Sequence, residues 1–198
     1  MRVSVTHIDQ FKYYCNSDKS LDAFLAELRG EVEPTPEMES GRAFHKMLEH
    51  VQSGQEIEQF EADGYTFEFK CDATLELPPI RELKGEATFD VDGEPVTLVG
   101  KVDAVDGLRV WDHKPTSRFD VNRFDSSFQW RAYLWMFDCT RFTYNIFVRS
   151  IKNGCVTIRE IHTLDFLRYP GMEQDMMAEL REFVAFARMH LPERLEAA

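Results

Sequence analysis

Two acidic residues and a lysine lie close together in the stretch Val99–Lys114, around the turn-forming dipeptide Asp106-Gly107. Asp103 precedes the dipeptide, and Asp112 and Lys114 follow it. An Asp-Gly pair between two β-prone segments predicts a hairpin with a two-residue turn. In that hairpin Asp103 and Asp112 are diagonal neighbours on one face, with Cβ atoms about 7 Å apart, so that a single divalent cation can bridge them.

The predicted register places Asp103 opposite Val110 and Asp112 opposite Lys101, and Lys114 projects from the same face. Two carboxylates that converge in this way repel each other unless they are protonated, paired or bound to metal. The alternative is a solvated strand face on which Lys101 and Lys114 pair with the two acids. Pro115 has no N–H to donate, and we expect the ladder to end there.

Four motifs of this chain resemble, in type and in their order along the sequence, those of PD-(D/E)XK nucleases. They are most similar to those of the RecB family. Gly-Lys-Val-Asp, a turn and Trp-Asp-His-Lys-Pro-Thr form the first motif. Upstream, Gly41 and His45 match a Gly-x-x-x-His helix, and downstream, Gln129 and Tyr133 match a Gln-x-x-x-Tyr helix. A helix that ends at Cys15 resembles the start of such domains, so the similarity runs from residue 4 to residue 150.

The resemblance implies an active site that binds Mg²⁺, for which Mn²⁺ can substitute. Asp103 and Asp112 are metal ligands in this interpretation, and Lys114 is the third catalytic residue. Three further candidate ligands are His45, the backbone carbonyl of His113, and Glu86. An ordinary surface or core histidine is the alternative for His45, and a solvated strand glutamate is the alternative for Glu86.

A second group of residues is predicted to contact the substrate. Gln129 and Tyr133 lie one helical turn apart, and the resemblance implies that both face the active site and position DNA or the catalytic lysine. The alternative for Tyr133 is a place in the core. Candidate phosphate contacts, which would be independent of sequence, are the basic side chains of Arg118, Arg123, Arg131 and Lys152.

The function that these residues predict is metal-dependent hydrolysis of DNA phosphodiester bonds, as by an exonuclease in recombination or repair. Alternatives are an endonuclease or single-strand-trimming nuclease of the same fold, a non-catalytic DNA-end binding module, and an interaction domain with an acidic surface. By analogy with phage and prophage exonucleases, we expect a homo-oligomeric ring and a single-strand annealing or recombination protein as partner. A bacterial, prophage or phage origin agrees with this analogy.

The net charge of −12 opposes DNA binding at long range. The charge is uneven, however, because residues 101–159 contain ten Lys and Arg against six Asp and Glu. A basic working face on an acidic body is compatible with phosphate binding. The chain has no Gly-x-x-x-x-Gly-Lys-Ser/Thr loop for ATP, so it cannot drive its own unwinding of DNA.

The four cysteines form no Cys-x-x-Cys pair, which favours free thiols in a reducing compartment. Some relatives hold an iron–sulfur cluster with one early cysteine and three late ones. Because only Cys139 and Cys155 lie late here, no cluster is predicted. The chain has no apolar run long enough to span a membrane, and a cytoplasmic location is expected.

The periodicity of apolar residues predicts an α/β (α+β) fold, a central mixed sheet flanked by helices, in one domain over residues 1–198. The resemblance implies a restriction-endonuclease-like core. We expect helices at 4–15, 20–29, 37–53, 126–138 and 171–190, with Ser4 or Thr6 capping the first. Strands are expected near 64–70, 73–77, 85–91, 95–105, 108–114, 141–151 and 154–161.

Overall fold

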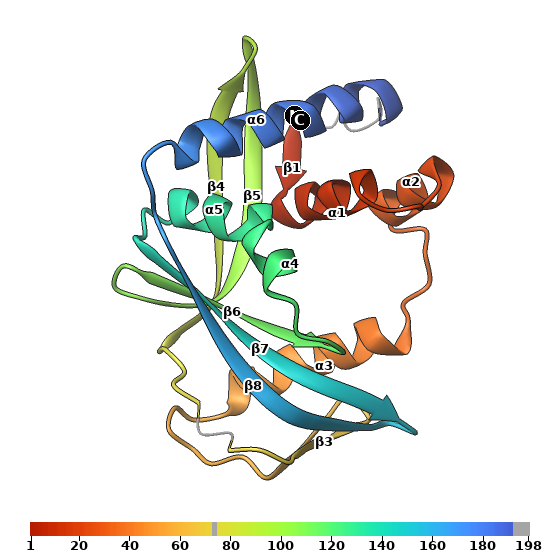
Figure 1. Cartoon of the computed structure of the whole chain (residues 1–198), viewed down its shortest axis with the longest axis vertical. Coiled ribbons are helices and arrows are strands. Elements are labelled where there is room, and N and C mark those ends of the chain that lie inside the picture. Colours follow the sequence, from red (N-terminus) through yellow and green to blue (C-terminus); the bar gives the residue numbers. More distant parts are fainter. Residues whose placement is uncertain (73–74, 192–198) are drawn as a thin grey trace.

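An eight-stranded mixed sheet forms the centre of the molecule, with helices on both faces (Figure 1). The computed structural model describes residues 1–72 and 75–191. The strands lie in the order β1-β5-β6-β7-β8-β3-β2, and β4 pairs with β5 outside this path. Three pairs, β1 with β5, β3 with β8 and β6 with β7, are parallel, and the other pairs are antiparallel. The predicted fold class is confirmed.

Strands and helices are interspersed along the chain. The strands are β1 (Arg2–Ser4), β2 (Gln59–Ala62), β3 (Tyr65–Phe69), β4 (Ile80–Val91), β5 (Glu94–Asp106), β6 (Arg109–Thr116), β7 (Arg141–Lys152) and β8 (Cys155–Leu167). The helices are α1 (Val5–Cys15), α2 (Leu21–Arg29), α3 (Pro36–His50), α4 (Val121–Asp125), α5 (Phe128–Met136) and α6 (Met172–His190).

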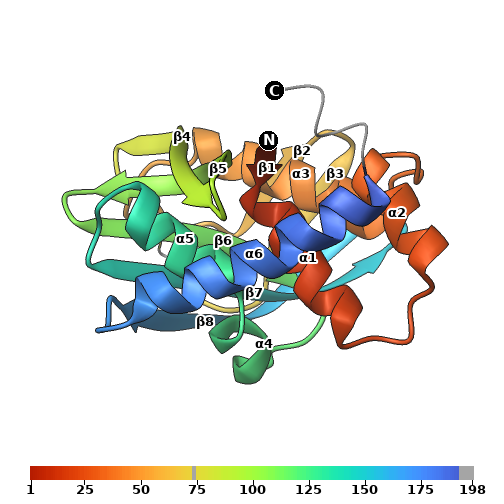
Figure 2. The same cartoon turned by 90° about the horizontal axis from the view of Figure 1, so that it is seen from above.

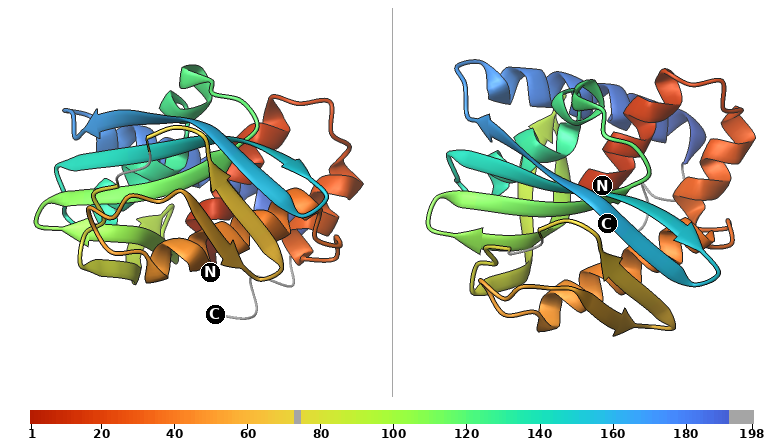
Figure 3. Two further views of the ribbon diagram at one scale, coloured as in Figure 1. Left: turned by 90° about the horizontal axis from the view of Figure 1, so that it is seen from below. Right: turned by 60° about the horizontal axis from the view of Figure 1, so that its bottom comes forward.

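Two apolar cores hold the helices against the sheet. The first joins α1, α2, α5 and α6 to the sheet and is rich in aromatic rings. Figure 2 shows α1 and α6 side by side over this face. The second core lies beneath α3, where Phe44 and Met47 pack against Phe147 and the strands β3 and β8. Figure 3 shows α3 beside β2 and β3, away from α6. The two cores leave β5 and β6 between α3 and α5.

Helix caps and hairpin turns follow the sequence closely. Ser4 begins α1 by accepting a hydrogen bond from the N–H of His7 at 3.1 Å, and Ser20 caps α2 in the same way. Asp92-Gly93 and Asn153-Gly154 form two-residue turns in which all four residues have positive φ, as a type I′ hairpin requires. The predicted cap at Ser4 is confirmed.

The hairpin between β5 and β6 is displaced by one residue from its predicted position. Its turn is Gly107-Leu108, closed by Asp106 and Arg109, and Gly107 has φ +54°. A type II′ turn needs positive φ at its first central residue only, which glycine supplies. The predicted pairing of Asp103 with Val110 is therefore wrong. The loop still contains two residues, and the observed register, extended beyond its last pair, places Asp103 opposite Asp112.

Three elements were not predicted: β1, β2 and α4 are short, and their apolar patterns are weak. The strand expected at 73–77 is wrong for residues 75–77, which form none, and residues 73–74 lie outside the described part. β4 begins at Ile80 and β8 ends at Leu167, both beyond their predicted limits.

Pro115 does not end the β6 ladder, contrary to the sequence prediction. It lies opposite Phe147 in the parallel pairing with β7, which continues through Thr116. The pairing of β6 with β5 has already ended at Trp111, so the missing N–H interrupts nothing on that edge.

No helix within residues 1–72 and 75–191 is long and apolar enough to cross a membrane. The four cysteines are free thiols, of which Cys139 is buried and Cys15 exposed.

Candidate metal centre

The strands β5 and β6 separate at the two predicted acids. Their last paired residues are Ala104 and Trp111, one position before Asp103 and Asp112 would meet. Instead, Oδ2 of Asp103 accepts a hydrogen bond from the backbone N–H of His113 at 2.6 Å. The Asp103 side chain thus takes the place of the next backbone hydrogen bond between β5 and β6. The strands separate there and leave room for a ligand.

Asp103 lies beside two further side chains that can bind metal. Its Oδ1 is 3.3 Å from Nδ1 of His45, which α3 brings to the edge of the opening. His45, Glu82 and Asp103 each offer one ligand atom, and these atoms lie within 4.8 Å of one another. The three side chains line a hollow of about 10 Å³ that they share with His113, roughly enough for one water-sized species. The structure therefore joins His45 to Asp103 as predicted and adds Glu82.

Glu82 has a strained backbone at the point where it faces Asp103. The β4–β5 pairs on either side, Arg81 with Ala104 and Leu83 with Val102, place Glu82 directly opposite Asp103, but these two do not pair. Glu82 has φ +55°, a left-handed conformation that costs a non-glycine residue about 1–3 kcal/mol and often marks a functional site.

The sequence contains a signal for Glu82, although this residue was not among the predicted ligands. The Asp92-Gly93 turn fixes the β4–β5 register, and extension of that register leads from the turn to Glu82 opposite Asp103. Glu86, the acid chosen from the resemblance, lies opposite Val99 instead. Its carboxylate forms a 2.9 Å ion pair with Arg2 and is 62% exposed. The structure does not bring Glu86 into the site.

His45 and Asp103 attract each other electrostatically, and each shifts the pKa of the other. Burial lowers the pKa of His45, but the carboxylate of Asp103 outweighs this effect, and the net pKa is raised above its usual value. Burial likewise raises the pKa of Asp103, yet His45 and the nearby lysine hold that pKa well below its usual range. Without a metal the site thus favours a protonated imidazole beside an ionised carboxylate.

Asp112 lies next to this group and is almost completely buried, at 2% exposure. Its Oδ2 is 2.7 Å from Nζ of Lys114, and its Oδ1 accepts a hydrogen bond from Nε2 of Gln129 at 2.9 Å. Burial raises the pKa of Asp112 to about 6, against the effect of Lys114. Burial lowers the pKa of Lys114, but Asp112 and Asp103 raise it more, to about 12.

Gln129 and Tyr133 both face the site from α5. The hydroxyl of Tyr133 donates to the carbonyl of Lys101 at 2.9 Å, on the edge of β5 left open by the separated strands. Tyr133 is also 2% exposed and part of the first core, so the alternative interpretation of this residue is confirmed, and its role in positioning DNA or the lysine stays a prediction. Its ring covers Gly100, where a Cβ would lie 2.4 Å from Tyr133 Cε1.

Asp9 holds the start of α5 and was not foreseen from the sequence. Its carboxylate accepts hydrogen bonds from the N–H of Phe128 at 2.6 Å and from Oγ of Ser127 at 2.9 Å. Ser127 also receives the hydroxyl of Tyr144 at 3.1 Å. Burial raises the pKa of Asp9. The network fixes the first turn of α5, and with it the position of Gln129.

The other predicted residues are placed as follows. The ring of His113 lies toward Phe147 in the core beneath α3, and burial lowers its pKa to about 4. Its carbonyl stays a predicted ligand. Arg131 donates to Ser127 and Tyr169 and covers the ring of Trp130, so its guanidinium already has partners within the protein. Its contact with phosphate stays a prediction. The remaining three candidates are exposed: Arg118, Arg123 and Lys152.

Gly41 lies one helical turn before His45, and an added Cβ would meet no atom within 4 Å. No described element approaches it closely, so close packing of another element is not what the glycine allows. The open space at Gly41, one turn from His45, is therefore available to a ligand.

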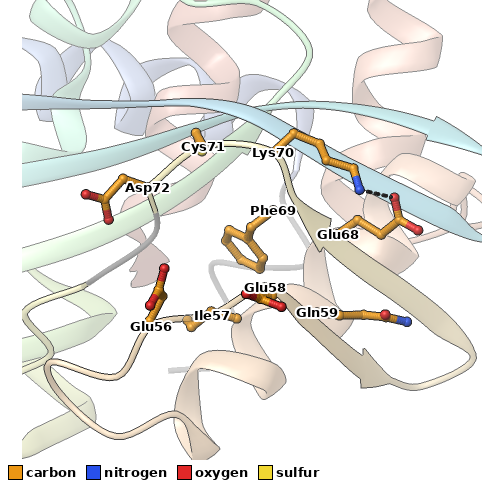
Figure 4. A pocket seen from close by; sticks show the side chains of 9 residues that line it. All are labelled: Glu56, Ile57, Glu58, Gln59, Glu68, Phe69, Lys70, Cys71 and Asp72. Atoms are coloured by element: carbon orange, nitrogen blue, oxygen red, sulfur yellow. Dashed lines mark ion pairs between the residues drawn. The ribbon is translucent and has the colours of Figure 1, made fainter.

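A larger hollow, of about 690 Å³, lies apart from these residues along β2 and β3 (Figure 4). Glu56, Glu58, Glu68 and Asp72 line it, and Lys70 forms a 3.2 Å ion pair with Glu68. Four carboxylates against one lysine repel a phosphate, so this hollow is less suited to DNA than the small centre between α3 and β5.

The chain matches no protein-family model and no curated protein. Among solved structures it is similar to the crystal structure of SSO0001, with 14% sequence identity and a TM-score of 0.53. The match covers 93% of this chain and 75% of that one. At this level of identity the likeness shows the fold alone, a mixed sheet flanked by helices.

Proposed function

We propose that this protein is a metal-dependent DNA nuclease that degrades linear DNA as an exonuclease. The observation that carries the proposal is the convergence of His45, Glu82 and Asp103 on one small hollow, next to the Asp112–Lys114 ion pair. Two carboxylates and an imidazole beside a buried acid and an amine suit phosphodiester hydrolysis better than they suit a structural role.

The donor set fits a hard divalent cation such as Mg²⁺ or Mn²⁺, which prefer carboxylate oxygens and accept an imidazole. Asp103, Glu82 and His45 would hold the ion. Asp112, which interacts electrostatically with Asp103 and His45, would be a further ligand. The strain at Glu82 supports this assignment, because a left-handed conformation at a non-glycine residue often marks a functional site. When bound, the cation supplies Lewis-acid chemistry, which acidifies water and stabilises negative charge on phosphate oxygens.

The protein's own side chains have separate tasks. The raised pKa keeps Lys114 protonated at neutral pH, so that its Nζ donates hydrogen bonds to the attacking water or to a phosphate oxygen and does not accept a proton. Gln129 fixes one oxygen of Asp112, and Lys114 lies against the other. Tyr133 holds the open edge of β5 at Lys101. Positioning of this kind accounts for much of the catalytic effect in phosphoryl transfer.

The proposal extends to assembly. A chain with net charge −12 retains DNA poorly as a monomer. A homo-oligomeric ring around the duplex would replace electrostatic affinity with enclosure, and a single-strand annealing or recombination protein would receive the product. Sedimentation of the protein alone and with linear duplex tests this part separately.

The central experiment is digestion of end-labelled linear duplex, single-stranded DNA and covalently closed circular DNA with Mg²⁺. We expect linear DNA to be degraded by the wild type, and the activity to be lost in EDTA and in the Lys114→Ala and Asp103→Asn variants. Cleavage of closed circles would instead indicate the endonuclease. Activity that survives both EDTA and Lys114→Ala would contradict the proposal. DNA binding without cleavage in any divalent ion would favour the end-binding module.

A further inference from the structure

A groove runs along β1, β4 and β5, on the face of these strands opposite α5. Its volume is about 540 Å³, and its basic lining residues are Arg2, Lys84 and Lys101. Gly85 and Gly100 form part of its floor, and their missing side chains would point the other way, toward Tyr133 of α5 and Phe137, the residue that follows α5. The groove is therefore a solvent-facing surface of the sheet and lies outside both apolar cores.

Two lysines face each other across this groove. Lys84 and Lys101 are direct partners in the antiparallel pairing of β4 with β5, and both are exposed. Like charges directly opposite each other on neighbouring strands destabilise the sheet. The protein keeps this pair although acids outnumber bases elsewhere in the chain, which suggests that the two ammonium groups bind a ligand.

The groove leads directly to the candidate metal centre. Lys101 forms an ion pair with Glu82, the same acid that lies within 4.8 Å of His45 and Asp103 through its ligand atoms. The Lys101 side chain is 50% exposed, so its ammonium group can also reach an anion in the groove. At the far end Arg2 pairs with Glu86, but at 58% and 62% exposure such a pair contributes little and exchanges easily.

The first turn of α1 adds uncharged donors to the groove. Ser4 and Thr6 line it, and the first turn of α1 contains no acidic residue. Oγ of Ser4 accepts the N–H of His7 at 3.1 Å, so its own O–H is available to donate. Hydroxyl groups and lysines along a strand face are the donors that contact the nucleic-acid backbone without reading sequence.

We infer that this groove binds the phosphodiester backbone of a DNA strand, with Lys84 and Lys101 as its phosphate contacts next to the metal centre. The inference rests on the proposed function and adds the path of the substrate. It differs from the contacts expected from sequence, because the strands β4 and β5 carry the path and the exposed arginines around α4 do not.

The test compares the Lys84→Ala/Lys101→Ala double variant with Lys46→Ala/Lys70→Ala, which removes the same charge from exposed lysines elsewhere. Binding to a labelled single-stranded oligonucleotide and to a duplex is measured in EDTA over a range of salt concentrations. EDTA separates binding from cleavage, and thermal unfolding verifies that each variant is folded. Cleavage with Mg²⁺ is measured in parallel on the same preparations.

We expect the slope of log affinity against log salt to become shallower only in the groove variant. Loss of two phosphate contacts predicts a change of about 1.4 for single-stranded DNA or about 1.8 for duplex, and at 0.1 M salt roughly tenfold weaker binding or more. An unchanged slope, or an equal change in the control, would overturn the inference. If the wild type cleaves DNA and the groove variant cleaves equally well, the proposed nuclease activity is supported and the proposed DNA path along the groove is contradicted. If the groove variant loses DNA binding and the wild type does not cleave DNA, the proposed DNA path is supported and the proposed nuclease activity is contradicted.

Discussion

Nε2 of Gln129 donates a hydrogen bond to Oδ1 of Asp112 at 2.9 Å, and this bond links α5 to β6, the strand that carries Lys114. Both side chains are buried, Gln129 at 7% and Asp112 at 2% exposure. The amide cannot be replaced by water without a rearrangement, because the first turn of α5 is itself anchored by Asp9. One side chain from a separate helix thus sets the orientation of a buried carboxylate.

Gln129→Leu should therefore impair catalysis more than folding. It removes a donor from a buried carboxylate, an effect worth about 1–3 kcal/mol, and raises the pKa of Asp112 further above its present value. Because Asp112 then ionises only at higher pH, the acidic limb of the pH–rate profile should move to higher pH. The cleavage rate at neutral pH should fall by about 10- to 100-fold. Gln59→Leu, on the exposed edge strand β2, is the control; an unshifted profile in Gln129→Leu would contradict the role given to Asp112.

Glu82 and Glu86 provide a matched pair for the metal centre, since they lie on the same strand four residues apart. Only Glu82 lies beside His45 and Asp103, whereas Glu86 pairs with Arg2. Loss of an outer-shell partner of a metal site typically lowers affinity 10- to 100-fold, so loss of a direct ligand should lower it by at least about tenfold. Mn²⁺ titration followed by electron paramagnetic resonance should show this loss in Glu82→Gln. Glu86→Gln should bind Mn²⁺ like the wild type. Weaker binding in Glu86→Gln than in Glu82→Gln would instead indicate that Glu86, the candidate from sequence, is the ligand.

The sequence predicted the positions that depend on local chemistry. Asp103, Asp112 and Lys114 were singled out because they flank a predicted two-residue turn, and a one-residue displacement of that turn left these three charged groups near one another. Glu82 was missed for two reasons. Its position opposite Asp103 depends on the pairing of β4 with β5 ten residues away from the Asp92-Gly93 turn, and its left-handed backbone occurs at a residue that is not glycine. Asp9 was missed because its partners lie at the start of α5, more than a hundred residues away. Local sequence patterns do not predict which helices pack against each other.

Metal binding should depend on pH through His45. The carboxylate of Asp103 raises the pKa of His45, so a proton occupies the imidazole at a pH where an isolated histidine would be neutral. A divalent cation must displace that proton. Mn²⁺ affinity should therefore fall as the pH drops through the raised pKa, above the usual 6.5, and binding at neutral pH should release protons.

Calorimetry in buffers of different ionisation enthalpy measures the protons released. His45→Asn should bind more weakly and lose most of this proton release. His162→Asn is the control, because His162 pairs with Glu160 and stacks on Phe119 outside the centre. Equal proton release in wild type and His45→Asn would mean that another group titrates on metal binding.

Gly41 offers a test in which stability and activity should move in opposite directions. It lies inside α3, where glycine is less stable than alanine by about 0.5–1 kcal/mol, and a Cβ there would contact no atom within 4 Å. Gly41→Ala should therefore raise the free energy of unfolding by that amount in urea titrations. The added methyl group would occupy the space one turn from His45 in which we expect the substrate, so KM for DNA should rise while Mn²⁺ affinity is unchanged. A variant that is more stable and fully active would show that the substrate does not use this space, and would leave the metal centre itself untouched.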